Sequence, residues 1–500
     1  MLTEAEIKRF MDEDFASEKK KQARTGRAYY EGKHDIGQYR MFYYNADGEL
    51  KEDTFRSNIR ISHPFFTELV DQVVQYALSG DEGFIRSDVP ELQAEMDSRF
   101  NENEDFLAEL SEALTGAVSD GWAYMYAHKV DEDMTEFQAA ECAGVIEVRA
   151  KDTDTNTEHV IYWYVDRIEK GQKQIKRIQV WDEKQVGYFV QTDEGEIEKD
   201  KSEKLNPRPH TLYQEENAEG ETEGPITYED YGQIPFFRLD NNKKQRSDLW
   251  TIKDIIDDYD IHACSLSNNL IDFDTPLHVV RGYEGDNLDE LQTNLKTKKV
   301  VGVGEEGGVE VRTVDIPYQA RLAKLELDER NIYRFGMGLN TFGLKDTNAT
   351  TNVAIRAAYS LLDLKCSKLT IRLKQFLRKL IAVALAEINE ANNTDYQQKD
   401  VYFSFTHEVM TNATENAQIA LTEAQTKQVQ VGTILNVAAQ IGSDAALKAI
   451  CEIMELDFDE VKAQVEQMQA EQGTATARAA LEGVVTEDEP AAENSAAAIP

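Results

Sequence analysis

The longest uninterrupted helical pattern in this chain of 500 residues runs from Val353 to Asn389, and it constrains the fold more than any other feature. The segment holds neither proline nor glycine, the residues that most often end a helix. At a rise of ~1.5 Å per residue, its 37 residues predict a helix of roughly 55 Å. It is also the one strongly basic segment, with seven basic against two acidic residues.

The basic face of this helix allows three interpretations. Lys365, Lys368, Arg372 and Lys379 share one face, with Arg356 a few turns earlier. Only one aromatic residue, Phe376, is interleaved, which is too little for a base-stacking platform that binds nucleic acid. We favour a subunit interface with an acidic neighbour, because the Asp-rich segment 252–272 has the opposite sign. An ordinary charged surface is the second interpretation.

The chain as a whole is strongly acidic, with 93 acidic and 54 basic residues and a formal net charge of −39. This balance argues against a free-standing protein that wraps DNA or RNA, because affinity for phosphates needs clustered lysine and arginine. At roughly 150 residues per domain, the length suggests about three domains or one large irregular one. A hydrophobic content of 41% is enough for a real core.

Targeting and redox features are sparse. Residues 1–10 are charged, so no signal peptide is expected. The apolar run Leu380–Ala386 has seven residues against the ~20 of a membrane span, so no membrane partner is expected. Cys142, Cys264, Cys366 and Cys451 never form a C-x-x-C pair and predict buried free thiols.

The N-terminal half changes from helical to strand periodicity. The first 130 residues predict mostly helix, with one helix over Pro64–Leu78 after a Ser62 cap and an acidic one over Leu92–Ala127. A period of two then predicts an antiparallel meander of about four strands, at 145–148, 159–166, 174–180 and 185–192. The polar residues 191–232 predict a solvated excursion before a strand at 234–239.

The next segment predicts two helices around a small α/β tip. A helix with one apolar face, including Leu266 and Leu270, is expected from Leu249 to about Thr275, and a returning helix from Tyr318 to about Phe335. The tip between them would hold a strand at 277–283, a short helix at 288–295, and a hairpin of 300–303 with 309–314. A polar loop bracketed by glycines leads to the long helix, followed by a strand at 401–406 and helices over 415–470.

Several short motifs suggest chemistry that their context does not support. Gly302–Gly307 matches G-x-G-x-x-G, but Val309–Val314 alternates as a strand where a nucleotide site needs a helix, so we expect a hairpin turn. Asp152–Asn156 begins like a calcium loop but lacks the glycine and the final glutamate, which favours a β-turn.

Two residue classes could still suggest a metal site. Carboxylates hold the metal ions of many nucleases, but the spacing of Asp254, Asp257, Asp258 and Asp260 favours a solvated helix face. None of the eight histidines lies at metal-ligand spacing with a second histidine, so structural or surface roles are expected. We find no active-site motif and expect no enzyme activity, metal or cofactor.

Longer signatures give the chain a family resemblance. The segments 29–36 (YYEGKHDI), 61–66 (ISHPFF) and 69–72 (LVDQ) resemble the N-terminal signature of portal proteins from siphophages of Gram-positive hosts. The resemblance continues through 234–237, 241–244, 249–260, 282–283, 315–317, 352–355 and 359–365. It covers about residues 25–390 in the same order, and the combination is specific even though each piece is short.

The resemblance implies a portal fold of the α+β class, predominantly helical, with wing, stem, clip and crown regions. The helix–tip–helix segmentation fits it independently. The expected regions are a wing at 1–248 (helices plus the antiparallel meander 144–240), a stem helix at 249–272, a clip at 273–317, a second stem helix at 318–338, a tunnel loop at 339–352, a long wing helix and strand at 353–410, a helical crown at 411–470 and a disordered tail at 471–500.

The resemblance also implies partners. The chain would form a dodecameric ring at one capsid vertex, through which the terminase motor drives double-stranded DNA without sequence specificity. The large terminase subunit, a head-completion or connector protein, the scaffolding protein and the major capsid protein would be its other partners. Its locations would be the virion and, during assembly, the host cytoplasm.

Candidate site residues follow from this picture. Stem acids in an acidic channel would repel phosphates and keep DNA mobile; the candidates are Asp254, Asp257 and Asp258. The tunnel loop would touch DNA transiently through Lys345, Asp346, Asn348, Thr350 and Thr351. Arg356, Lys365, Lys368 and Arg372 are candidates for the subunit interface. The clip would dock terminase and connector near Val300, Val303, Val309 and Val311, with strand edges paired between subunits.

Two other classes of protein fit the composition. One is an acidic enzyme such as a carboxylate-metal nuclease, but the sequence contains no motif for it at usable spacing. A scaffold or adaptor without a channel would share the acidity but would not explain two helices around a tip.

Overall fold

A computed structural model describes residues 2–464 except for 55, 81–82, 130–133, 150–155, 170–172, 194, 217–221, 273–276, 284–286, 288, 290, 292–302, 313–316, 341–351, 407–412, 455–457 and 459–460. The chain divides into two compact units, Met1–Asn348 with Ala354–Val409, and Ala349–Val353 with Met410–Pro500. Among the described helices, none has the length and apolar character needed to cross a bilayer.

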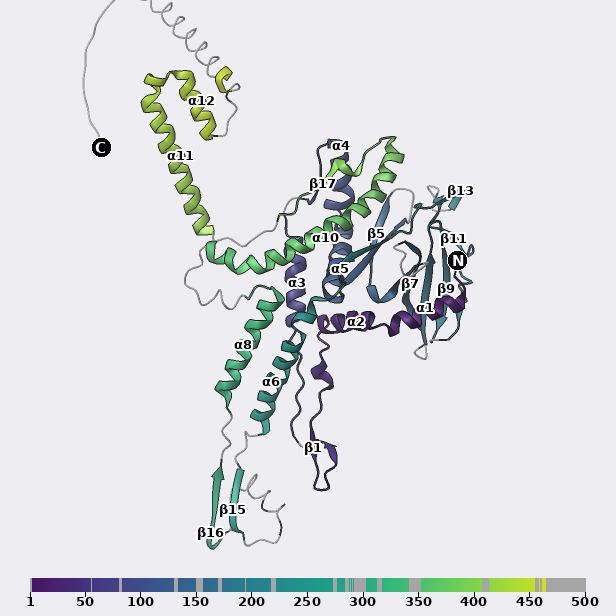
Figure 1. The fold of residues 1–500 in the computed structure, drawn as a ribbon, viewed down its shortest axis with the longest axis vertical. Helices are drawn as coiled ribbons and strands as arrows, with labels where there is room; N and C mark the ends of the chain where they lie inside the picture. The colour runs from purple at the N-terminus through teal and green to yellow at the C-terminus, as the bar shows by residue number, and fades with distance from the viewer. Residues whose placement is uncertain are drawn as a thin grey trace, which may run out of the picture. The chain divides into compact units, whose positions relative to one another are not determined.

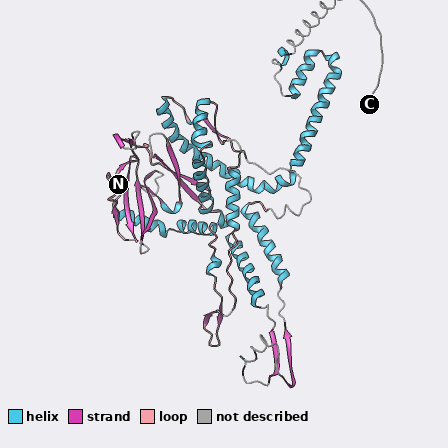
Figure 2. Ribbon diagram, turned by 180° about the vertical axis from the view of Figure 1, so that it is seen from behind, coloured by secondary structure: helices cyan, strands magenta, loops and turns pink. Residues whose placement is uncertain are grey.

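The core of the first unit is a set of helices around one long helix (Figures 1 and 2). The helices of this unit are α1 (Glu4–Ala16), α2 (Glu18–Tyr30), α3 (Phe65–Ala77), α4 (Pro90–Met96), α5 (Glu104–Asp120), α6 (Lys253–Asp272), α8 (Tyr318–Gly336) and α10 (Asn352–Asn392). Short helical turns are η1 (Asp35–Gln38), η2 (Asp97–Asn101), η3 (Cys142–Gly144), η4 (Asp248–Thr251) and η6 (Gln398–Asp400). The expected long helix is confirmed, since α10 is one helix of 41 residues.

Periodic apolar residues explain why α3, α5 and α10 form this core. Each buries a stripe spaced three and four residues apart, as in Leu69, Val70, Val73 and Val74 of α3. Leu373, Leu377 and Leu380 of α10 are fully buried in the same cluster. The helix predicted over Pro64–Leu78 is therefore confirmed, although Pro64 rather than Ser62 precedes its first turn and no side chain caps it.

The second predicted helix is shorter than expected. The acidic stretch is divided by the π-helical turn η2, and α5 ends at Asp120, followed by Gly121, whose φ of +109° is a left-handed cap. The following residues form a strand, β4 (Trp122–Lys129), which pairs with β5 (Thr135–Ala140) and β14 (Phe236–Asp240). The helical expectation was wrong for 121–127 because glycine stops the helix and aromatic residues then suit a sheet.

The predicted four-stranded meander is confirmed. Its strands are β6 (Val145–Arg149), β7 (Thr157–Glu169), β8 (Lys173–Trp181) and β9 (Gln185–Thr192), each antiparallel to the next. Helix α1 covers one face through Ile7, and β4 packs on the other through Trp122 and Tyr124 (Figure 1). The tight-turn expectation for Asp152–Asn156 falls largely outside the described residues.

The expected solvated excursion at 191–232 contains strands instead. They are β10 (Ile197–Lys199) and β11 (Arg208–Pro209), which extend the meander sheet through β9, and the separate hairpin of β12 (Thr211–Glu216) with β13 (Thr222–Glu229). Two of these strands, β10 and β11, are short and polar, so pairing with β9 rather than their own composition determines that they form strands. Elsewhere, β17 (Val401–Phe403) pairs with β3 (Ile85–Ser87), within the strand expected at 401–406.

Helices α6 and α8 form the antiparallel pair that the sequence predicts, with a β tip between them (Figure 1). The tip pairs β15 (Leu277–Tyr283) with β16 (Val303–Arg312). The expected hairpin of 300–303 with 309–314 was wrong: residues 303–312 are one strand. The glycine-rich segment is a bulge in it, where Tyr283 pairs with Val303 and Arg281 with Gly308. Gly282 at this bulge has φ +65°, a glycine conformation.

The second unit is helical in its described part. Helix α11 (Ala413–Ile441) packs against α12 (Ser443–Met454), and Gly442 between them has φ +92°. This agrees with the helices expected over 415–470. The tail expected at 471–500 lies outside the described residues.

Candidate functional site

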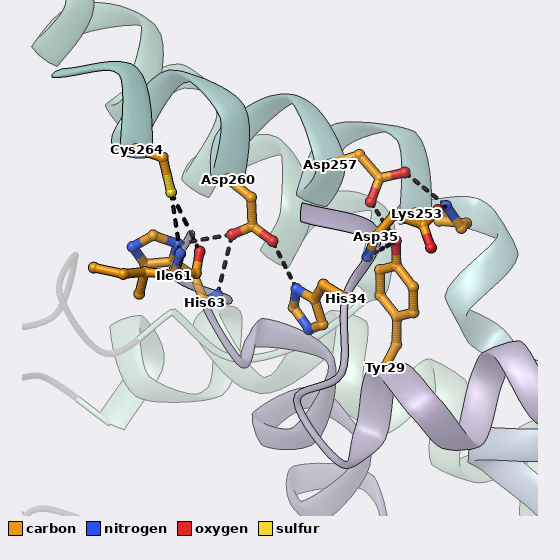
Figure 3. Close-up of polar contacts among 9 residues, drawn as sticks. All are labelled: Tyr29, His34, Asp35, Ile61, His63, Lys253, Asp257, Asp260 and Cys264. Atoms are coloured by element: carbon orange, nitrogen blue, oxygen red, sulfur yellow. Dashed lines mark hydrogen bonds and ion pairs between the residues drawn. The ribbon is translucent and has the colours of Figure 1, made fainter. Parts of the chain in front are cut away.

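The candidate site is a buried polar cluster on α6, at the base of the α6–α8 pair (Figure 3). Four residues spaced by four, Ile256, Asp260, Cys264 and Asn268, form the buried stripe of this helix. The carboxylate of Asp260 is fully buried, with 0% of its side chain exposed. The expectation of a solvated carboxylate face was therefore wrong for Asp260. The signal that could have placed it is the spacing of four from Ile256 and Cys264.

Two histidines from different segments satisfy the Asp260 carboxylate. His34 Nδ1 lies 2.7 Å from Oδ2, and His63 Nδ1 lies 2.7 Å from Oδ1. The backbone N–H of His63 also donates to Oδ1, at 3.0 Å. Because an ionised carboxylate only accepts, both rings carry a proton on Nδ1. Burial raises the pKa of Asp260, but the hydrogen bonds from His34 and His63 outweigh it and lower the pKa below its ordinary value.

An extended segment, 57–63, continues this contact along α6, and we call it the strap. The backbone N–H groups of Ser57, Ile59 and Ile61 donate to Asp272 Oδ1 at 3.2 Å, Asn268 Oδ1 at 2.7 Å and Cys264 Sγ at 3.2 Å. The backbone N–H of His63 bonds Asp260 in the same way. Every second residue of the strap therefore donates a backbone hydrogen bond to every fourth residue of α6.

The two spacings match physically. Two extended residues advance ~6.6 Å, and four helical residues advance ~6 Å. A helix face therefore acts as the hydrogen-bonding partner that the strap would otherwise lack. The Cys264 thiol returns the contact by donating to the Ile61 carbonyl oxygen, at 3.5 Å.

A second group of polar contacts lies one turn earlier on α6. Tyr29 donates its hydroxyl to Asp257 at 2.5 Å, and Lys253 bridges Asp257 at 2.7 Å and Asp35 at 2.6 Å. Tyr29 also stacks on His34, with ring centroids 4.5 Å apart. Burial, followed by the hydrogen bond to Asp257, raises the pKa of Tyr29. These contacts tie the end of α2 to the beginning of α6.

The family signatures in the sequence converge on this cluster. Segments 29–36, 61–66 and 249–260 are far apart in sequence, yet each supplies residues to the contacts of Figure 3. The signature therefore encodes one structural junction. Its chemistry is that of a structural polar core, because the carboxylate and both histidine Nδ1 atoms bind one another. The buried Nε2 of His34 has no hydrogen-bond partner among the described residues.

A second junction holds the end of α8, where the chain enters the predicted tunnel loop. Met337 caps α8 in a left-handed conformation with φ +58°. The backbone of Leu339 then exchanges two hydrogen bonds with the Gln72 amide on α3, at 2.8 and 3.0 Å. A Cβ on Gly338 would lie 2.0 Å from Leu69 Cδ2, so glycine permits this approach.

The predicted channel acids have different surroundings. Asp254 is exposed, whereas Asp257 contacts Tyr29 and Lys253. Asp258 pairs with Lys324 of α8 at 2.5 Å. The charges of Asp257 and Asp258 are thus compensated within the chain, and only Asp254 presents a carboxylate without a described ion pair. The predicted channel role stays a prediction for all three.

The remaining predicted site residues fall into three groups. Lys345, Asp346, Asn348, Thr350 and Thr351 of the loop, and Val300 of the clip, lie outside the described residues. Val309 and Val311 are exposed on β16, with Val303 half-buried at its start. On α10, Arg356 and Lys368 are exposed and Arg372 is half-buried, but Lys365 pairs with Asp248 at 2.8 Å and donates to the Gly336 carbonyl at 3.0 Å.

The expectations about metals and thiols can be compared with the described residues alone. Within those ranges no group of three or more metal-binding side chains is assembled. All four cysteines are free and buried, as the sequence predicts. Burial raises the pKa of Cys366 to about 12, which keeps that thiol protonated and unreactive.

A family model and two related proteins agree with the family resemblance. The family model described as "Phage portal protein, SPP1 Gp6-like" matches residues 13–477. The portal protein of Bacillus phage SPP1 is 25% identical over 395 residues, covering 79% of this chain and 75% of that protein. The portal protein of Clostridium phage phiCD119 is 26% identical over 414 residues, covering 77% and 85%. A solved chain titled "Neck of native GTA particle computed with C12 symmetry" aligns with a TM-score of 0.38 and 11% identity, covering 72% of this chain and 86% of that one.

Proposed function

Since the chain belongs to the SPP1 Gp6-like family of phage portal proteins, we propose that it forms a dodecameric ring at one capsid vertex and serves as a DNA channel there. Family members are structural parts of the phage particle and not enzymes. DNA would enter through the ring during packaging and leave through it at ejection. The protein would pass through the host cytoplasm during assembly and end in the virion.

The observation that best supports this function is the α6–α8 pair with its β tip. Lys324 of α8 forms an ion pair with Asp258 of α6, and Arg321 Nη1 donates to Ser265 Oγ at 3.2 Å. Polar side-chain contacts therefore hold the two helices together. The buried cluster at their base joins them to the rest of the unit. Twelve such pairs side by side would make a stem that surrounds a channel, with the tip as the clip.

The tunnel loop would form the constriction of that channel. Its entrance is held by α3 through Gln72 and by α10 through Lys365, so the loop would start from a fixed point. We place Lys345 there as the one cation among Asp346, Asn348, Thr350 and Thr351, touching passing DNA transiently.

The clip would offer Val309 and Val311 of β16 to the large terminase subunit and later to a head-completion or connector protein. Both valines are exposed, at 43% and 56%, and β15–β16 is a sheet of only two strands in the described part of the tip. Exposed strand edges invite pairing with another chain. The scaffolding and major capsid proteins would contact the ring elsewhere.

A charge reversal tests the acidic channel. Asp254→Lys would add up to twelve cations to a ring that must let phosphates slide, so we expect slower DNA packaging. The measurement is the rate of genome packaging into heads that carry the variant. The matched control is Glu91→Lys, the same charge change at an exposed position of α4. Equal packaging rates for both variants and the unchanged chain would contradict the channel role of Asp254.

A further inference from the structure

The segment between η1 and the strap, residues 39–53, is an arm built on a two-stranded hairpin of β1 (Phe42–Tyr44) and β2 (Leu50–Glu52). Every residue of both strands is exposed. Five large apolar or aromatic side chains are uncovered within the arm: Tyr39 at 41%, Phe42 at 55%, Tyr43 at 40%, Tyr44 at 73% and Leu50 at 58%. Clusters of this kind mark interaction surfaces, where tyrosine and phenylalanine are enriched.

The arm is held in place although no described core covers it. Its two sides are joined by the Asp53 N–H bond to the Met41 carbonyl at 2.8 Å and by the Arg40–Glu52 ion pair at 2.7 Å. The Asn58 side-chain amide donates to the Tyr39 carbonyl at 3.2 Å, which attaches the arm to the strap and hence to α6. A segment fixed in this way loses little conformational freedom on binding.

The size of the exposed surface indicates the kind of occupant. With about half of each side chain exposed, and ~200 Å² per large side chain, the arm offers roughly 500 Å² of apolar surface. A stable independent complex needs ~800 Å² from each partner. The arm is therefore too small to hold an unrelated protein by itself, and it suits one part of a larger contact between copies of this chain.

The chain also carries a matching uncovered surface on the α6–α8 pair. Leu270 and Ile271 of α6 are each 54% exposed, and Tyr318 and Leu322 of α8 are 54% and 44% exposed. The Ser57 contact with Asp272 places the base of the arm at the level of this apolar end of α6. Rotation about a ring axis parallel to the helices leaves the height of every residue along that axis unchanged. The arm of one copy would therefore lie beside this surface on the neighbouring copy.

We propose that the arm packs its aromatic side chains against the α6–α8 surface of a neighbouring copy. This interface rests on the proposed ring and adds a specific, head-to-tail contact to it. Each copy gives one arm and receives one, so both uncovered surfaces are buried when the ring closes.

Site-specific cross-linking identifies the surface that the arm touches. Tyr44 in the full chain is replaced by the photoreactive amino acid p-benzoylphenylalanine, the assembled protein is irradiated, and the cross-linked peptides are sequenced by mass spectrometry. We expect links between copies to peptides from 261–272 or 318–335. Links between copies only to other regions, or links only within one chain, would overturn the proposal.

Paired variants test whether the contact stabilises the ring. Phe42→Ser combined with Tyr44→Ser should raise the protein concentration at which half the chains are in rings by about tenfold or more, as expected for interface anchors. Ile168→Ser on β7, at a side chain 66% exposed, is the control and should assemble like the unchanged chain. Native mass spectrometry measures the assembly. A normal ring at the same concentration in the paired variant would overturn the arm contact, whereas an unchanged chain that forms no ring would overturn the proposed function itself.

Discussion

Asp260 joins three separate segments through one buried carboxylate. It accepts from His34, from the His63 ring and from the His63 backbone, and all three contacts are 2.7–3.0 Å long. Such a group is costly to bury unless every acceptor position is used. Its neighbours therefore stabilise the base of the α6–α8 pair only as long as the carboxylate is present and ionised.

The first prediction concerns this carboxylate. Asp260→Asn keeps the size of the side chain but removes the charge and replaces one acceptor by a donor that faces a histidine N–H. We expect the free energy of unfolding to fall by ~3 kcal/mol, the range for breaking a buried pair. Urea unfolding followed by tryptophan fluorescence measures it.

The control for Asp260→Asn is Asp254→Asn, at an exposed residue of the same helix, which should change the free energy of unfolding by no more than ~0.5 kcal/mol.

The pH dependence of the free energy of unfolding gives a second check. Because the pKa of Asp260 is lowered in the folded state, its contribution is present above the ordinary pKa of ~3.9 and is lost as the pH falls through the lower folded value. The unchanged chain should lose stability below about pH 4 more steeply than Asp260→Asn, and parallel curves would contradict the role assigned to Asp260.

At the level of single residues, the sequence identified the segments of the junction but not their contacts. Tyr29, His34 and His63 lie inside the family signatures, yet nothing local shows that all three meet on α6. Asp260 was grouped with Asp254 because both are acidic, although the four-residue spacing of α6 separates them. Long-range hydrogen bonds decide which carboxylate is buried, and a local pattern contains no information about them.

At the level of elements, the end of α8 depends on glycine. Gly338 lies against Leu69 of α3, and its neighbour Leu339 is tied to Gln72. A methyl group at position 338 would displace the buried side chain of Leu69, and the backbone at Leu339 would shift with it.

The second prediction follows from that close approach. Gly338→Ala should lower the free energy of unfolding by ~1–3 kcal/mol, the usual cost of overpacking a core. Gly37→Ala is the control, because a Cβ there meets nothing within 4 Å, and it should be neutral or slightly stabilising. Differential scanning calorimetry of both variants measures the change. Equal melting temperatures would show that the α3–α8 contact adapts without strain.

Elements with a strong local period could be predicted, and elements defined by their partners could not. α10 and the meander β6–β9 carry their periodicity in the sequence, and their bounds agree with the structure to within a few residues. The strands β10 and β11 are short and polar, and the tip strand β16 includes a glycine bulge. In these cases the neighbouring strand supplies the hydrogen bonds, so composition alone indicated loop or turn.

At the level of the whole molecule, α10 contrasts with the acidity of the chain. Arg356 and Lys368 are exposed on it together with apolar side chains such as Ile371, which is 61% exposed. An apolar centre with a charged rim is typical of protein interfaces. With a net charge of −39 on every copy, a basic face would find complementary charge on a neighbouring copy of the proposed ring.

The third prediction tests this face by charge reversal. Lys368→Glu combined with Arg372→Glu should give monomers or small oligomers by native mass spectrometry, because the new acids would face an acidic neighbour. The control is Lys243→Glu with Lys244→Glu, an equal charge change at exposed positions outside α10. If both double variants assemble like the unchanged chain, α10 is an ordinary charged surface, the second interpretation drawn from the sequence.

The central claim is that this acidic chain assembles into a ring with a channel. Electron micrographs of the purified full-length protein, classified by view without imposed symmetry, test it most directly. We expect end-on views of a ring with twelve repeats around a central hole, and side views with a narrow stem. A population of compact monomers without a hole, at concentrations where the protein is folded, would contradict it.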